Sequence, residues 1–99
     1  MLATNDQSAH HYVELKKEKA IEYGVNVIVE KLNQNAKTKD CINIISKWNN
    51  DEQIDGILVQ IPLFKHIDKF RVLNSVKVSK DVDGLSAHMQ GMVNQLIKY

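Results

Sequence analysis

The sequence contains few of the residues that cross-link or interrupt small proteins. Its 99 residues include one cysteine, one proline and four glycines. The lone Cys41 cannot form an internal disulfide and indicates a reducing compartment, so we expect a cytoplasmic protein. The four glycines are widely separated and form no glycine-rich phosphate loop. The sequence therefore excludes a disulfide-stapled scaffold and gives no basis for a dinucleotide-binding fold.

A strong net charge and long apolar runs are missing as well. The formal net charge is +1, which gives no reason to expect nucleic acid or an anionic membrane as a partner. No apolar run reaches the roughly 18 residues of a membrane-spanning helix, and the chain is polar from Thr4 onward, unlike a signal peptide. With 43% hydrophobic and 25% charged residues, the composition predicts a single globular domain over residues 1–99.

The first part of the chain predicts a helix followed by a strand. The helix is expected from about Ala9 to Tyr23, because Gly24 stands where a helix C-cap belongs. The β-branched run over residues 25–30 then predicts a short strand. Side chains that can accept a hydrogen bond from the first turn of the helix are those of Asn5, Asp6 and Ser8.

The second part predicts another strand between two further helices. A helix capped by Thr38 or Asp40 is expected to end at the polar run 49–51, and it carries the apolar residues Ile42, Ile44, Ile45 and Trp48. A strand over residues 57–61, a helix over 67–76 and a loop over 77–84 follow. The pattern over residues 88–99 indicates a last helix that Gly91 interrupts.

This order of helices and strands defines an α/β fold with parallel strands. Because the strand over residues 57–61 is apolar except for Gln60, helices are expected to cover both of its faces. We therefore predict a three-layer α/β/α arrangement in which helices flank a short parallel sheet. Two strands are too few for a stable sheet, so a first strand is expected to be missing from this chain or supplied by a partner.

Two motifs contain the polar residues expected of a small-molecule site. They are Asp55-Gly-Ile-Leu-Val-Gln-Ile-Pro-Leu63 and Lys80-Asp-Val-Asp-Gly84. The ends of strands are where open α/β sheets bind ligands. Gln60, a polar residue in an apolar run, either pairs with backbone groups or orients Lys16 or a substrate amide. Asp81 and Asp83 either form an ordinary turn, bind a metal, or hold a ligand that presents two adjacent N–H donors.

The first helix adds a second pair of candidate residues. Tyr12 and Lys16 are four residues apart, so both side chains project from the same face. A partly buried lysine beside an aromatic ring can act as a proton shuttle or base. The simpler alternative is a lysine that extends along a solvated helix face, which the neighbouring Lys17 and Lys19 favour.

The histidines and the cysteine give no clear sign of a metal site. His10 and His11 point to different sides of the predicted helix, and His66 and His88 are isolated, so no metal is expected. Cys41 lies near the start of a helix, where it is either a low-pKa thiolate or a small buried apolar side chain; we expect the second.

Five motifs, in this order and spacing, closely resemble the N-terminal catalytic domain of bifunctional methylenetetrahydrofolate dehydrogenase/methenyltetrahydrofolate cyclohydrolase. The resemblance runs from about Tyr12 to Gly91. The motifs are Tyr12-Val-x-x-Lys16, Gly24, the segment Asp55 to Leu63, His66-Ile-Asp68 and Lys80-Asp-Val-Asp-Gly84.

The resemblance implies folate one-carbon chemistry on tetrahydrofolate derivatives. In the family, the residue matching Tyr12 packs along the substrate, and the lysine matching Lys16 is the key group of the cyclohydrolase step. The glutamine matching Gln60 hydrogen-bonds that lysine and helps to set its protonation. The aspartate matching Asp83 holds the pterin ring, and Pro62 is expected beside the substrate as well. The family also implies NADP or NAD as the cofactor, and a homodimer or a pairing with a related chain.

The sequence also departs from the family pattern. The family's glycine, proline and serine positions ahead of the tyrosine hold Thr4, Gln7 and Ala9, and Met89 replaces a polar residue. No strand is expected in residues 1–9, and the NAD(P)-binding domain that follows in the family is not in this sequence, so dehydrogenase activity is not expected of this chain alone. The alternatives are a non-catalytic remnant that binds folate or oligomerises, and a gene-model fragment of a full-length enzyme.

Overall fold

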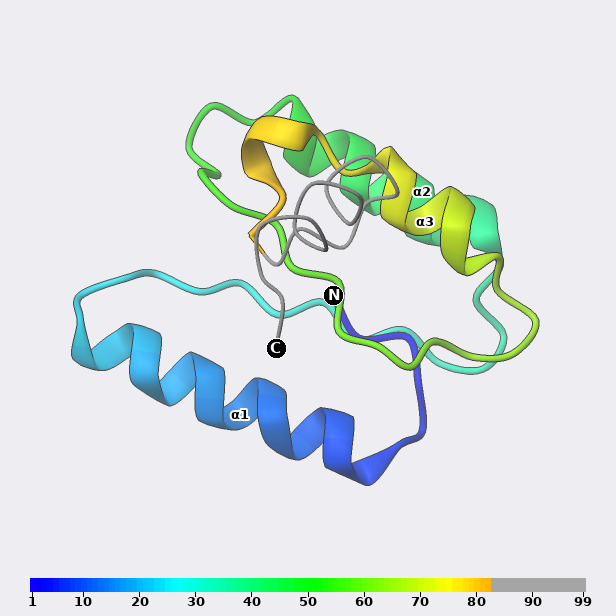
Figure 1. Cartoon of the computed structure of the whole chain (residues 1–99), viewed down its shortest axis with the longest axis horizontal. Coiled ribbons are helices and arrows are strands. Elements are labelled where there is room, and N and C mark those ends of the chain that lie inside the picture. Colours follow the sequence, from blue (N-terminus) through cyan, green and yellow to red (C-terminus); the bar gives the residue numbers. More distant parts are fainter. Residues whose placement is uncertain (83–99) are drawn as a thin grey trace, which may run out of the picture. The chain divides into compact units, whose positions relative to one another are not determined.

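The computed structural model describes residues 1–82 and contains three α-helices and one short 3-10 helix in that range (Figure 1). The predicted last helix and Asp83 lie outside the described residues. The described residues divide into two compact units: the first comprises Met1–Ala36 and Val59–Phe64, and the second comprises Lys37–Leu58 and residues 65–82. The single domain predicted over residues 1–99 stays a prediction.

Helix α1 (Gln7–Glu22) belongs to the first unit and has a hydrogen-bonded cap at each end. The Asp6 carboxylate accepts a hydrogen bond of 2.8 Å from the Ala9 N–H, which makes Asp6 the N-cap among the predicted candidates. At the other end Gly24 adopts φ 77°, and its N–H donates to the Ile21 carbonyl. The Val25 N–H also donates to the Ala20 carbonyl, which completes a Schellman motif. The helix is confirmed, although it begins two residues before the predicted start at Ala9 and ends one residue before Tyr23.

The N-terminal residues form the backbone pairing that the sequence did not predict. Leu2 makes parallel bridges to both Lys31 and Gln60, so the first three residues lie between two extended segments of the first unit. The Leu2 N–H donates to the Glu30 carbonyl at 2.8 Å, and the Gln60 N–H donates to the Met1 carbonyl at 3.1 Å. The sequence predicted no strand in residues 1–9, and the pairing of Leu2 there consists of isolated bridges that the prediction did not include.

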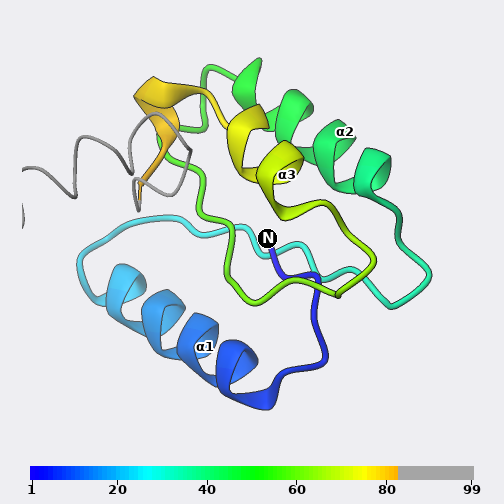
Figure 2. The ribbon, with the colours of Figure 1, turned by 45° about the vertical axis from the view of Figure 1, so that its right-hand side comes forward.

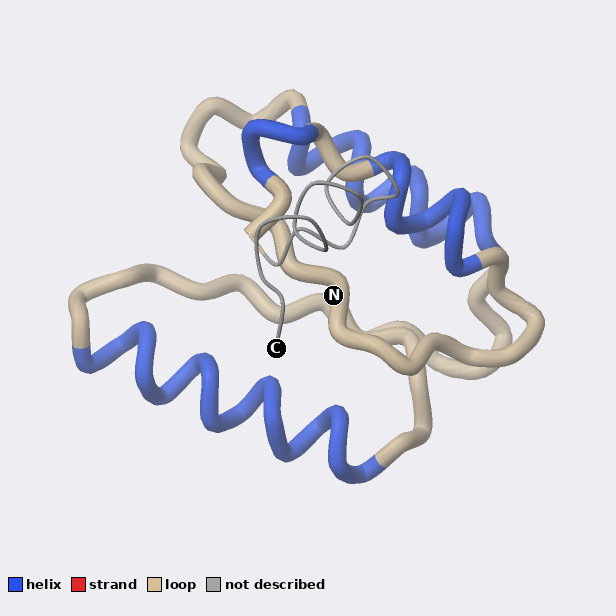
Figure 3. The backbone as a smooth tube through the Cα atoms, viewed as in Figure 1, coloured by secondary structure: helices blue, strands red, loops and turns tan. Residues whose placement is uncertain are grey.

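The predicted strands are shorter than the β-branched runs suggested. Figure 3 draws no strand among residues 1–82, because the pairing there consists of isolated bridges. In the first unit the bridge forms at Lys31, so only the last residue of the run 25–30, Glu30, takes part through its carbonyl, and in the second unit Ile57 bridges Asp81. All three bridges are parallel, as predicted, but the continuous sheet and the three-layer arrangement stay predictions.

The second unit is built on α2 (Thr38–Asn49) and α3 (Lys69–Ser75), which lie side by side in Figures 1 and 2. Its buried apolar side chains come from both helices and from the segments beside them: Cys41, Ile45, Ile57, Ile67, Val72, Leu73 and Val76. The Asp68 carboxylate caps α3, and the Asp68 N–H donates to Thr38 Oγ1 at 2.9 Å. These contacts hold the starts of α2 and α3 together.

Two local predictions in this unit need correction. Neither Thr38 nor Asp40 is the N-cap of α2: the N-cap is Lys37, and the Asp40 side chain accepts a hydrogen bond from the Lys37 N–H. The predicted loop over residues 77–84 also contains the 3-10 helix η1 (Val78–Lys80). The predicted end of α2 is confirmed, since Asn50 is its C-cap. Within residues 1–82, no helix combines the length and the apolar character needed to cross a membrane.

Candidate functional site

The first unit brings Lys16 and Gln60 together. Lys16 Nζ donates a hydrogen bond of 3.0 Å to Gln60 Oε1, across 44 positions of the sequence. Lys16 is exposed on α1 and Gln60 is half-buried. A lysine that only extends along a solvated helix face would not need a partner in another segment. The contact therefore favours the reading in which Gln60 orients Lys16, while the catalytic role of the pair stays a prediction.

Hydrogen bonds from both the side chain and the backbone of Gln60 fix the orientation of its side-chain oxygen, Oε1. Its side-chain Nε2 donates to the Ile61 carbonyl at 3.1 Å, which leaves Oε1 to face Lys16. Its backbone N–H donates to the Met1 carbonyl, and four residues later the Phe64 N–H donates to the Ala3 carbonyl at 2.7 Å. The N-terminal segment therefore fixes the backbone that carries the glutamine.

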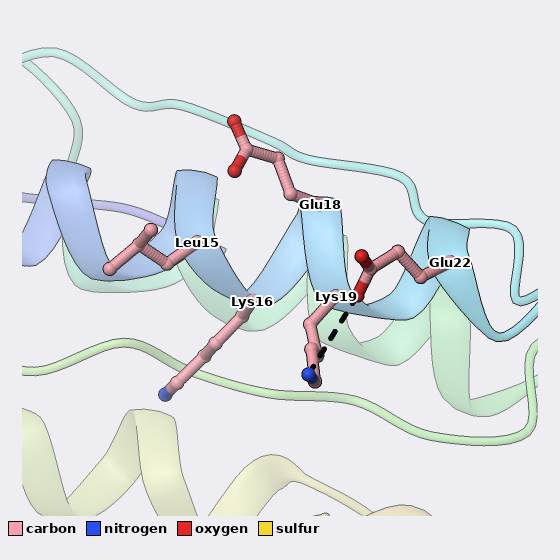
Figure 4. Close-up of a pocket in the computed structure, with 5 residues that line it drawn as sticks. All are labelled: Leu15, Lys16, Glu18, Lys19 and Glu22. Carbon is pink, nitrogen blue, oxygen red and sulfur yellow. Dashed lines mark ion pairs between the residues drawn. The ribbon is translucent and has the colours of Figure 1, made fainter.

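The neighbouring lysine on α1 has different partners. Lys19 forms an ion pair of 3.7 Å with Glu22, and its Nζ lies 5.7 Å from the centre of the Tyr23 ring. In Figure 4, Lys16 and Lys19 extend to the same side of α1, whereas Glu18 points to the opposite side. Leu15 and these four charged residues of α1 line a surface pocket. Lys19 is thus engaged within its own helix, while Lys16 reaches another segment.

Tyr12 and Pro62 present open surface near the two ends of this pair. Tyr12 lies one turn before Lys16 on α1 and is 57% exposed, with its ring 6.5 Å from that of His11. Pro62 is exposed and follows Gln60 by two residues, after a cis peptide bond. An exposed aromatic ring can stack on a flat ligand. The substrate-binding roles of both residues remain predictions.

Of the two predicted aspartates, only Asp81 lies in the described range. Its backbone pairs with Ile57, because the Ile57 N–H donates to the Lys80 carbonyl at 2.6 Å and the Val82 N–H donates to the Ile57 carbonyl at 3.3 Å. The backbone up to Val82 is therefore hydrogen-bonded to Ile57, at the start of the predicted strand 57–61. Asp83, the residue expected to bind the pterin, lies outside the described residues.

Two residues near this turn were missed by sequence reasoning. Asn49 was read only as a helix-ending residue, and Lys80 only as the start of a turn. Lys80 Nζ donates to the carbonyls of Trp48 and Asp51, and Asn49 bonds to backbone groups at the end of α3 and in the loop that follows it. No short-range pattern contains this signal, since the partners are about 30 positions apart in sequence.

The cysteine and the histidine considered as candidate functional residues make structural contacts instead. Cys41 is fully buried, and burial, assisted by the negative charge of Asp40, raises the pKa of its thiol. The low-pKa thiolate is thus excluded, and the small buried apolar reading is confirmed. His10 Nε2 donates to the Thr4 carbonyl at 2.8 Å and helps to fix the turn before α1. Among residues 1–82, no three His, Cys, Asp or Glu side chains gather as metal ligands would.

Family comparison agrees with the class that the fold and the site suggest. The family model described as the catalytic domain of tetrahydrofolate dehydrogenase/cyclohydrolase matches residues 1–83. The chain therefore belongs to the tetrahydrofolate dehydrogenase/cyclohydrolase catalytic-domain family. The match begins at residue 1, so the N-terminal pairing segment is part of the family domain.

Individual relatives carry the name bifunctional protein FolD. The chain is 43% identical over 86 residues to the protein from Borrelia garinii subspecies bavariensis, covering 87% of this chain and 29% of the relative. It is 40% identical over 84 residues to that from Halothermothrix orenii, covering 85% of this chain and 30% of the relative. The chain thus spans about three tenths of the length of these relatives.

Solved structures show the same fold. The bifunctional FolD methylenetetrahydrofolate dehydrogenase/cyclohydrolase from Campylobacter jejuni superposes with a TM-score of 0.87 at 34% identity, over 98% of this chain and 34% of that one. The bifunctional enzyme from Thermoplasma acidophilum gives a TM-score of 0.83 at 29% identity, over 95% of this chain and 34% of that one. The α/β class predicted from the sequence is the class of these structures.

Proposed function

We propose that this chain acts in folate one-carbon metabolism as a catalytic domain that hydrolyses 5,10-methenyltetrahydrofolate to 10-formyltetrahydrofolate. The observation that supports this most is the 3.0 Å hydrogen bond from Lys16 Nζ to Gln60 Oε1, in a chain of the tetrahydrofolate dehydrogenase/cyclohydrolase family. In the reaction, water adds its oxygen to the methenyl carbon and the bond from that carbon to N5 breaks. Of the two protons of water, one ends on N5 and the other is released.

Lys16 is the residue to which we assign the proton transfer. Its Nζ relays a proton between the attacking water and N5, and the Gln60 carbonyl aims Nζ at the substrate. Gln60 is a suitable support because Ile61 and Met1 already fix its side chain and backbone. A relay group works only when it is held within hydrogen-bond reach of both ends of the transfer.

Tyr12, Pro62 and Asp83 are assigned to substrate binding. The exposed ring of Tyr12 stacks along the aromatic part of the folate, and Pro62 contributes apolar contact beside Gln60. The carboxylate of Asp83 accepts two hydrogen bonds from adjacent N–H donors of the pterin.

The dehydrogenase reaction is proposed for a protein of the relatives' full length. It is not proposed for the residues of this chain alone. It oxidises 5,10-methylenetetrahydrofolate with NADP or NAD, and the choice between the two cofactors is part of that proposal. The glycines of this sequence form no phosphate-binding loop, so the residues present do not fit a dinucleotide. We therefore assign no hydride-transfer step to this chain. A cytoplasmic location, which the single buried thiol favours, belongs to the same proposal.

The alternative is a non-catalytic remnant, which was motivated by an absent first strand that a partner chain would replace. We favour the catalytic reading over it because Leu2 already forms bridges to Lys31 and Gln60 within the first unit. Pairing with a second copy or a related chain is still a proposal, which light scattering of the purified protein tests. A folate-binding chain without turnover would favour the remnant.

The test compares Lys16→Met with Lys19→Met. Both changes remove one lysine from the same side of α1, but only Lys16 contacts Gln60. We expect Lys16→Met to lower cyclohydrolase turnover by roughly 10²–10⁴-fold while calorimetric titration with a folate analogue shows nearly unchanged affinity. Lys19→Met should keep both. Turnover that survives Lys16→Met unchanged would sink the assignment.

Substrate binding is tested separately with Asp83→Ala. Removing a carboxylate that accepts two charge-assisted hydrogen bonds costs about 1.5–3 kcal/mol of binding free energy, or roughly 10–150-fold in affinity. Calorimetric titration of the variant with the same folate analogue measures this. An affinity equal to that of the unmodified chain would remove Asp83 from the site.

A further inference from the structure

Lys80 closes the C-terminal end of α2. Its Nζ donates hydrogen bonds of 3.0 Å to the Trp48 carbonyl and 2.8 Å to the Asp51 carbonyl. The last carbonyls of a helix lack partners within the helix, and a positive charge at that end also interacts favourably with the helix dipole. Lys80 is half-buried, and its ammonium has two carbonyl acceptors, so the side chain is held in place by these contacts.

The backbone of the same residue is held as well. The Lys80 N–H donates to the Lys77 carbonyl at 2.8 Å, and the Lys80 carbonyl accepts from the Ile57 N–H at 2.6 Å. Two residues later the Val82 N–H returns a hydrogen bond of 3.3 Å to the Ile57 carbonyl. Lys80 thus joins three parts of the second unit: the end of α2, the 3-10 helix η1 and the segment around Ile57.

Asn49 provides a second connection from the same helix end. Its Nδ2 donates to the Ser75 carbonyl at 2.7 Å, and its Oδ1 accepts from the Lys77 N–H at 2.9 Å. The chain from the end of α3 to η1 is therefore bonded to α2 at Ser75, Lys77 and Lys80. Such a segment has few ways to shift without breaking several hydrogen bonds at once.

From these contacts we infer that Lys80 is a positioning residue for folate binding. It anchors the backbone through Val82, and Asp83, the carboxylate assigned to the pterin, is the next residue in the sequence. The inference rests on the proposed function for the identity of the ligand. It adds that the affinity for folate depends on an ammonium group that need not touch the ligand, because a bidentate contact tolerates little displacement of the carboxylate.

The experiment compares Lys80→Met with Lys47→Met and Lys80→Arg. Lys47 is an exposed lysine in the last turn of α2, so its removal takes the same charge from the same helix end. Arginine supplies several donors and a permanent charge, so Lys80→Arg should restore the contact. Two quantities are measured well below the melting temperature: affinity for 5-formyltetrahydrofolate by calorimetry, and amide hydrogen exchange at Ile57 and Val82.

We expect Lys80→Met to weaken folate binding about tenfold, equivalent to about 1.4 kcal/mol, and to speed exchange at Ile57 and Val82. Lys47→Met and Lys80→Arg should resemble the unmodified chain in both measurements. Exchange in the first unit, for example at Leu2, should not change, which separates a local effect from general destabilisation. If Lys80→Met does not fold, Lys80→Gln replaces it, because it keeps a polar side chain but loses the charge and the reach.

Each other outcome overturns a different claim. Unchanged exchange at Ile57 and Val82 in a folded variant would show that Lys80 does not anchor the turn. Faster exchange with undiminished folate affinity would show that the anchor has no role in binding. If the unmodified chain itself does not bind 5-formyltetrahydrofolate, the proposed function fails, and the positioning role fails with it.

Discussion

The close approach of Gly56 to Val82 leads to a prediction that depends on a single methyl group. A Cβ atom built on Gly56 would lie 2.6 Å from Val82 Cγ2, whereas the next atom, the Lys80 carbonyl oxygen, is 3.9 Å away. The first distance is a clash, and the second is an ordinary van der Waals contact. Gly56 does not have a positive φ, so alanine is compatible with its backbone. The steric conflict of Gly56→Ala therefore comes from Val82 alone.

The expected magnitude combines two opposing effects. Replacing glycine by alanine at a compatible position stabilises a protein by about 0.4–1 kcal/mol, because the unfolded chain loses freedom. Overpacking costs about 1–3 kcal/mol, and the lower half of this range applies because Val82 is 62% exposed and can move outward. Gly56→Ala should then lower the free energy of unfolding by roughly 0.5–1 kcal/mol. In the Val82→Ala background the same change should raise it by about 0.4–1 kcal/mol.

The assay is a double-mutant cycle in urea, followed by the fluorescence of Trp48, the single tryptophan of the sequence. Trp48 belongs to the same compact unit as Gly56 and Val82. The sign of the Gly56→Ala effect should reverse between the two backgrounds, with a coupling energy of roughly 1–2 kcal/mol. An effect of the same sign and size in both backgrounds would refute the steric reasoning. Because Val82 precedes Asp83, Gly56→Ala should also weaken folate binding, and the Val82→Ala change should relieve part of that loss.

Three further predictions follow from local geometry. Gly24→Ala should cost about 1–2 kcal/mol in urea denaturation, because the φ of 77° disfavours a side chain although no atom lies within 4 Å of the new Cβ; a cost near zero would contradict this. Asp6→Ala should cost about 1 kcal/mol by removing the N-cap of α1, and Asp6→Asn should recover most of it. Burial, assisted by Asp40, raises the pKa of the Cys41 thiol, so the folded protein keeps a proton that the unfolded chain releases. The contribution of this thiol to the free energy of unfolding is complete below the ordinary thiol pKa of about 8.5 and is lost as the pH rises further. Unfolding free energies of the unmodified chain and of Cys41→Ala, measured across that pH range, should therefore diverge. Identical pH profiles of the two proteins would contradict this.

The helix ends were predictable because their signals are local. The Asp6 carboxylate bonds to an N–H three residues away, and Gly24 supplies the positive φ that ends α1. Asn50, the C-cap of α2, likewise lies in the polar run where that helix was predicted to end. Asp68 caps α3, although the sequence predicted that this helix begins at residue 67. Caps of this kind involve residues within one helical turn, so a short window of sequence contains the whole interaction.

The backbone pairing was not predictable in the same way, because it depends on residues far apart. The run over 25–30 has the composition of a strand, yet the bridge forms at Lys31, opposite Leu2. Three N-terminal residues are too few to show a hydrophobic period. The family motif near this segment has a glycine and a proline, which Thr4 and Gln7 replace here. No strand was therefore predicted for these residues. Those replacements changed the turn residues but left the pairing segment intact.

The candidate site shows the same difference between local signals, which can be predicted, and contacts between distant residues, which cannot. Residue types alone left Lys16 as either a proton shuttle or a surface lysine, and the resemblance to a known family favours the first reading, which stays a prediction. The hydrogen bond to Gln60 joins positions 44 apart, a distance that no helical or strand period covers. Lys80 escaped notice for the same reason, since its acceptors lie 29 and 32 positions earlier. Contacts of this range are set by the fold and become visible only with it.

The backbone contacts of the segment that carries Gln60 bear on whether this chain can hold the Lys16–Gln60 pair in place. Sequence reasoning placed the catalytic pair on a scaffold whose first strand was thought to be absent. The Met1 carbonyl instead accepts from the Gln60 N–H, and the Ala3 carbonyl accepts from the Phe64 N–H, so both ends of the segment that carries Gln60 are bonded to the N-terminal residues. Leu2 is 1% exposed and Ala3 is fully buried, which makes this segment part of the core rather than a loose end. The backbone that aims Gln60 at Lys16 is therefore supplied by this chain itself.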